Sequence, residues 1–217
     1  MFGCSKEDPV ESLEERRARI IPDSLTFTQK IERLIPHSLF RLQALAENHA
    51  DSTTYAAINL TKFVPFSEMG AMFANRGFTI HQLYYGMGAF SGIYPVDPTI
   101  PMDSTLALLR LEARTELAEN IRLGSEEVAN IADEVQRQKV EEELDRMRVS
   151  LAGLDQTGPQ FYGAEVEGRP PVLLALMQHP EELVRVVFPG QPSEGSWVRL
   201  SPARYQLLMD NDRQVAQ

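Results

Sequence analysis

Histidine gains or loses a proton near neutral pH and is the commonest metal ligand, so the histidines are the first candidates for chemistry. The chain has His37, His49, His81 and His179. None has the His-Glu-x-x-His spacing that places two imidazoles on one face of a helix. His49 and His179 fall near the ends of predicted helices, where a cation interacts favourably with the helix dipole. A structural role is therefore expected for both, and no metal site is predicted.

His81 is the histidine best suited to bind a ligand. It falls in a predicted strand with Tyr84 and Tyr85, where it would line a polar face of a sheet. The competing interpretation is a structural histidine whose hydrogen bonds are made within the sheet. His81, Tyr84 and Tyr85 are the ligand-binding candidates, and they are also the starting point for an enzyme whose site is assembled from residues far apart in sequence.

The remaining patterns do not predict catalysis. Gly86, Gly88 and Gly92 follow a strand but match neither G-x-G-x-x-G nor a Gly-Lys-Ser/Thr phosphate loop, so a flexible loop that contacts partners or ligands is expected. The serines lack a nucleophile-elbow context. Acidic clusters at 126–127, 133–134 and 141–143 lie in helical sequence and are interpreted as a solubilising face rather than a calcium loop. No catalytic residue, metal or cofactor is predicted.

Length and charge limit the classes of partner. The 217 residues are 43% hydrophobic and 24% charged, which suits a globular chain with a sizeable core. The net charge of -10 argues against nucleic acid, because binding phosphates requires clustered Lys and Arg. No run approaches the roughly 18 apolar residues of a membrane span. A protein partner is the expected one.

Cys4 is the single cysteine, so the chain forms no internal disulfide and no cysteine-based zinc site. The segment Met1–Lys6 resembles the end of a bacterial lipoprotein signal, in which a small residue precedes the lipidated cysteine. The basic and apolar regions that should come before it are absent. Either Cys4 is an acylated anchor, which implies the cell surface or periplasm, or it is a free thiol of a cytoplasmic protein. Membrane contact is expected only through that anchor.

The elements that must position these residues form two β-α-β units. Strands are predicted over 53–64 and 78–85 around a helix at 67–75, and over 161–166 and 183–188 around a helix at 170–178. A helical pattern over 25–48 is divided by Pro36, which predicts two short helices or one kinked helix. A long irregular connection is expected over 86–101. The predicted organisation is a flexible tether at 1–22, one α+β domain at 23–190 and a polar tail at 191–217.

A helical hairpin is inserted between the two units at about 103–152. Its helices are predicted to break at Gly124, with one long helix bent at that residue as the alternative, and each carries an apolar stripe. Such a stripe either docks on a partner helix or folds back on the domain's own sheet, and the sequence leaves both open. Whether the two units share one sheet is also left open.

The order of the two units resembles a ferredoxin-like fold with a helical insertion. The second half, with Gly163 and Gly168 around a strand, resembles the closing half of extracytoplasmic sensor or regulatory modules in bacterial surface proteins. This resemblance implies a non-enzymatic binding, sensor or assembly module tethered through Cys4. The alternative is a cytoplasmic structural protein that forms a homo-oligomer through its helical hairpin.

Overall fold

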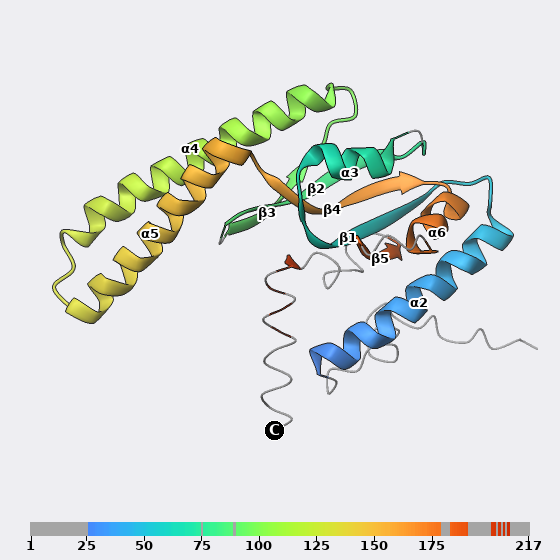
Figure 1. The fold of residues 1–217 in the computed structure, drawn as a ribbon, viewed down its shortest axis with the longest axis horizontal. Helices are drawn as coiled ribbons and strands as arrows, with labels where there is room; N and C mark the ends of the chain where they lie inside the picture. The colour runs from blue at the N-terminus through green and yellow to red at the C-terminus, as the bar shows by residue number, and fades with distance from the viewer. Residues whose placement is uncertain are drawn as a thin grey trace, which may run out of the picture.

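A computed structural model describes residues 26–74, 76–88, 90–178 and 183–190, together with residues 201, 202, 204, 206 and 208. The predicted tether with Cys4, His179 and most of the tail lie outside them. The described elements are α2 (Phe27–Asn48), β1 (Thr54–Val64), α3 (Phe66–Phe73), β2 (Thr79–Met87), β3 (Phe90–Pro95), α4 (Met102–Val128), α5 (Glu134–Thr157), β4 (Gln160–Gly168), α6 (Pro170–Gln178) and β5 (Val184–Pro189) (Figure 1). The α+β class predicted from the sequence is confirmed, while the closer likeness to a ferredoxin-like fold stays a prediction.

The strands form one five-stranded sheet in the order β3-β2-β4-β1-β5. Every neighbouring pair is antiparallel, with β4 in the middle between β1 and β2. The strands of the two β-α-β units therefore alternate in the sheet. This arrangement answers the question that the sequence left open, because the two units share one sheet.

The two faces of the sheet differ in chemistry. Alternating residues of the strands give one apolar face, which α3, α6 and the first turns of α4 cover to form the main core. Its buried strand residues are Ala56, Ile58, Leu60, Leu83, Ala164, Val166 and Val187. The opposite face, here called the polar face, buries Asn59, Tyr84 and Glu165, and where α2 covers it, it also buries the apolar residues Ala57, Val186 and Phe188. Ligand-binding candidates on the sheet must therefore be sought on the polar face.

Helix α2 is a single helix that continues through Pro36, so of the two arrangements expected there, two short helices is wrong and one kinked helix stays a prediction. Its start is fixed by a capping box, in which Thr26 and Gln29 each accept a hydrogen bond from the other's backbone N–H. Leu34 and Leu42 are buried on either side of the proline. Tertiary packing at both points holds one helix despite the missing backbone donor.

The connection predicted to be irregular over 86–101 contains strand β3. Met87 pairs with Phe90 across a tight turn, and the pairing with β2 continues to Gln82 and Pro95. Gly88 has a φ of 60°, a left-handed conformation that glycine adopts without a steric cost. Of the glycines and prolines that suggested a loop, Gly88 lies in this turn, Gly92 lies within the edge strand and Pro95 ends it.

The predicted break of the helical hairpin at Gly124 is also wrong, because α4 continues to Val128. A side chain at Gly124 would place its Cβ 2.7 Å from Leu144 Cδ2, so the glycine allows α4 and α5 to approach closely. The chain turns after Val128, and Asp133 caps α5 by accepting a hydrogen bond from the Gln136 N–H at 2.8 Å. Within the described part of the chain, no helix is both long and apolar enough to span a membrane.

Candidate functional site

The three predicted ligand-binding residues do not form one site. Strand β2 places His81 and Tyr84 on the polar face, whereas Tyr85 packs on the opposite face against the cluster of Met87, Ala113, Leu117 and Leu154. Burial raises the pKa of the Tyr85 hydroxyl, and the nearby Glu116 and Glu112 raise it further. Tyr85 is thus a packing residue between the sheet and the helical hairpin, and no common pocket with His81 is formed.

His81 lies at an irregularity in the pairing of β2 with β4, between Ile80 and Gln82. Its Nε2 is 3.5 Å from Glu167 Oε2, and its ring centroid is 4.9 Å from that of Tyr55. The Thr53 hydroxyl donates to Glu167 Oε1 at 2.6 Å. The Glu167 carboxylate thus joins Thr53 of the loop before β1 and His81 of β2 on the polar face.

Tyr84 belongs to a buried polar network in the middle of the polar face. Its hydroxyl donates to Glu165 Oε1 at 2.8 Å, and Glu165 is only 2% exposed. Arg185 donates to Asn59 Oδ1 at 2.9 Å on the neighbouring strands. Satisfied buried networks of this kind rigidify a core and specify its packing. The sequence signal for Glu165 is a carboxylate between Ala164 and Val166 in a predicted strand, and the candidates chosen from the sequence did not include it.

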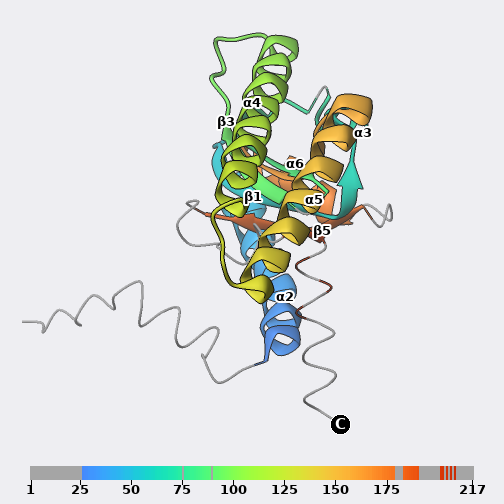
Figure 2. The same cartoon turned by 90° about the vertical axis from the view of Figure 1, so that its left-hand side faces the viewer.

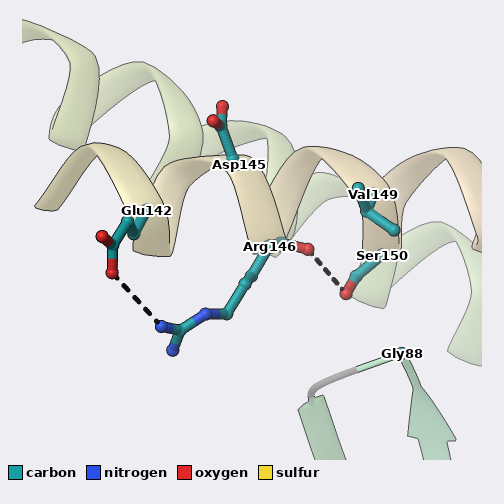
Figure 3. Close-up of a pocket in the computed structure, with 6 residues that line it drawn as sticks. All are labelled: Gly88, Glu142, Asp145, Arg146, Val149 and Ser150. Atoms are coloured by element: carbon teal, nitrogen blue, oxygen red, sulfur yellow. Dashed lines mark hydrogen bonds and ion pairs between the residues drawn. The ribbon is translucent and has the colours of Figure 1, made fainter. Parts of the chain in front are cut away.

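A hollow of about 450 Å³ lies where α5 leaves the sheet. One wall is Gly88 in the turn between β2 and β3, and the other is a row of α5 side chains (Figure 3). These are Glu142, Asp145, Arg146, Val149 and Ser150. The turn approaches α5 closely, since a Cβ on Gly88 would lie 2.6 Å from Ser150 Oγ. The hollow is thus created by the contact between the hairpin turn and α5.

The side chains of the hollow are paired charges and one exposed apolar group. Arg146 forms ion pairs with Glu142 at 3.9 Å and with Glu143 at 2.9 Å. In Figure 3 the Arg146 side chain, paired with Glu142, extends from α5 into the space beside Gly88. The Ser150 hydroxyl donates to the Arg146 carbonyl at 2.9 Å. Val149 is 71% exposed. The hollow is open to solvent and not enclosed, so it is suited to contact with a polypeptide segment more than to a small molecule, which is usually bound in an enclosed cleft.

The described residues offer no cluster of three or more His, Cys, Asp or Glu side chains placed to hold a metal ion. The sequence predicted a solubilising helix face for residues 141–143 and did not predict the hollow. Its only sequence signal is Val149, an apolar residue outside the stripe of α5. The contact with Gly88 comes from a turn more than fifty positions away and has no local signature.

The fold and the hollow define the class of the protein as an α+β domain whose single antiparallel sheet carries an inserted helical hairpin. Comparison of the chain with protein-family models, curated proteins and solved structures found no match. The functional argument therefore rests on the geometry of this chain alone.

Proposed function

We propose that the chain is a non-enzymatic binding or assembly module that recognises a protein partner through the outer side of its helical hairpin. The observation that carries this proposal is the hollow between Gly88 and α5, with Val149 exposed at its wall. The hairpin extends away from the sheet in Figure 1, and Figure 2 views it from the hairpin side. An extended, two-helix projection gives a partner a long surface with little steric hindrance.

The outer side of the hairpin is the surface available to that partner. Part of the apolar surface considered for docking packs inside the molecule, because Leu117 and Leu154 pack with the sheet and Leu144 packs on Gly124 of the facing helix. Val135, near the start of α5, is 64% exposed. The remaining surface of α5 is rich in carboxylates, including Glu141, Glu142 and Glu143. The partner is therefore a basic segment that inserts an apolar side chain beside Val149.

A lipid anchor at Cys4 would place this module at the bacterial cell surface or in the periplasm, as a tethered sensor or assembly factor. Cys4 lies outside the described residues. Membrane fractionation of the native gene product and of a Cys4→Ala variant tests the anchor. Loss of membrane association in the variant supports it, and a soluble wild type excludes it and favours the cytoplasmic alternative.

Site-specific photo-crosslinking tests the protein-binding proposal. A photoreactive phenylalanine analogue at Val149 is compared in living cells with the same analogue at Phe40, which is 67% exposed on α2. We expect an adduct from position 149 that is absent from position 40, with the crosslinked peptide of the partner rich in Lys and Arg.

Two outcomes would overturn the proposal. Position 149 would give no adduct beyond those of position 40, or it would crosslink only to a second copy of the chain. The second outcome favours the alternative in which the helical hairpin drives homo-oligomerisation. A Phe40→Glu variant, altered at an exposed apolar residue of α2 away from the hairpin, serves as the control that should leave the adduct at position 149 unchanged.

A further inference from the structure

Strand β3 presents an open edge of the sheet. Among the described elements only β2 packs extensively along β3, whereas the opposite edge strand, β5, lies against α2 and α6. An edge strand carries a row of backbone N–H and C=O groups that can pair with another chain. The direction of these groups on β3 decides what the edge can bind.

The hydrogen-bond pattern fixes that direction. Val96 N–H donates to His81 C=O at 2.8 Å, and the same register pairs Tyr94 with Leu83 and Gly92 with Tyr85. Because backbone groups alternate in direction along an antiparallel strand, the even-numbered residues of β3 face β2. The N–H and C=O groups of Ser91 and Ile93 therefore point outward, away from the sheet.

The side chains along this edge are apolar or neutral. Ile93 is 41% exposed, and residues 90–95 include no charged side chain. Above the strand, burial raises the pKa of the Tyr94 hydroxyl and the nearby Glu112 of α4 raises it further. Leu108 lies one turn before Glu112 and is 42% exposed. The open edge is thus an uncharged strip on a chain whose net charge is -10.

We propose that this edge pairs with the β3 strand of a second copy of the chain, antiparallel and centred on Gly92. In that register the outward N–H and C=O groups of Ser91 meet those of Ile93 in the other copy, and the reverse pair forms by symmetry. Gly92 faces Gly92 at the centre, where the absence of side chains allows the backbones to approach closely. The two sheets become one continuous sheet.

A second copy fits this edge better than an unrelated peptide. In a register symmetric about Gly92, two identical strands use the outward groups of Ser91 and Ile93 of both copies at once and bring no charged side chain to the contact. Two acidic chains repel elsewhere, and the uncharged strip lets them meet without facing like charges at the contact. Pro95 ends the ladder, because it has no N–H to continue the pairing. The interface is short, so we expect a concentration-dependent dimer.

Sedimentation velocity over a range of concentrations tests the dimer. The wild type should shift from the monomer to the dimer mass, and Ile93→Lys should remain a monomer with an unchanged circular dichroism spectrum. Val135→Lys adds the same charge at a residue that is 64% exposed on α5 and should dimerise like the wild type. A wild type that stays monomeric at every concentration, or an Ile93→Lys variant that dimerises normally, would overturn the proposal.

Amide hydrogen exchange gives a second readout that a folding defect does not mimic. The Ile93 amide faces outward, so it should exchange quickly in the monomer and become protected as the protein concentration rises. The Tyr94 amide faces β2 and should be protected at every concentration. Protection of Ile93 that does not change with concentration would exclude pairing through this edge. This dimer goes beyond the proposed partner binding and can fail without affecting it.

Discussion

The two edges of the sheet differ in what covers them. Next to β5, Leu34 of α2 packs with Val186 and Phe188, and the Arg41 guanidinium lies 5.7 Å from the centre of the Phe188 ring. At β3, Ile93 is exposed and no described helix packs extensively along the strand. Both strands are six residues long, so the difference comes from helices distant in sequence and not from the strands themselves.

The features proposed to bind other chains lie on the side of the open edge. Strand β3, its turn at Gly88 and the hairpin of α4 and α5 all belong to the segment between β2 and β4. Removing that segment would leave four strands in the order β2-β4-β1-β5. The covered edge thus belongs to the structural core of the domain, and the inserted segment provides the surfaces for recognition.

The largest expected effect is at the covered edge. Leu34→Ala should lower the free energy of unfolding by about 2–5 kcal/mol, because it removes a buried side chain and leaves a cavity between α2 and β5. Chemical denaturation measures this loss, and amide exchange of residues 184–189 should accelerate with it.

The matched change at the open edge is Ile93→Ala. At a concentration where the chain is monomeric, it should alter the free energy of unfolding by no more than about 0.5 kcal/mol, since the side chain is already exposed to water. Equal losses for the two variants would show that the two edges are equally protected and would contradict the comparison.

The covered edge was the easier one to predict from the sequence. The strand at 183–188 and the helix opened by Pro170 were located within a residue or two, because β-branched runs and proline at a helix start are local signals. Strand β3 was missed, since it combines glycine and proline with few β-branched residues and is stabilised by pairing with β2. Gly124 was misread as a break, because what requires a glycine there is the close packing of Leu144, which lies on the other helix.

The candidate site was less predictable than the fold. His81 and Tyr84 were placed on one face correctly, but Tyr85 was grouped with them although adjacent strand residues point to opposite faces. The hollow depends on the contact of Gly88 with Ser150, which only the tertiary structure brings together. Local patterns therefore identified the strand carrying candidate residues but not the surface that the geometry favours.

A smaller effect is expected at the turn of the open edge. Gly88→Ala should cost about 1–2 kcal/mol, because a φ of 60° is unfavourable for an L-residue and the new Cβ would crowd Ser150 Oγ. Gly153→Ala is the matched substitution in α5, where a Cβ meets no other atom within 4 Å. It should instead stabilise the chain by about 0.5–1 kcal/mol through helix propensity.

Thermal and chemical denaturation of both glycine variants check these signs. If Gly88→Ala were as stable as the wild type, the turn would not need its left-handed conformation and the wall of the hollow would be adaptable. A Gly153→Ala variant that is less stable than the wild type would mean that α5 is not a regular helix at that position.

The smallest effect is a pH dependence that distinguishes the two sides of the sheet. Burial lowers the pKa of His37 on α2, and Arg41 lowers it further, below the ordinary value of 6.5. The unfolded chain therefore takes up a proton that the folded chain resists, so stability falls as the pH drops below 6.5 toward the folded pKa. His37→Gln should remove this part of the acid sensitivity.

The opposite dependence is expected beside β3. The raised pKa of Tyr85 means that the unfolded chain loses its phenol proton near pH 10 while the folded chain retains it, so stability falls as the pH rises from there through the folded pKa. Tyr85→Phe should reduce this alkaline sensitivity and leave the acid limb unchanged, and His37→Gln should do the reverse. The free energy of unfolding measured against pH for both variants separates the two limbs. A variant that changed the acid and alkaline limbs equally would show that the substitution alters stability at every pH and that the titration of that residue does not cause one limb.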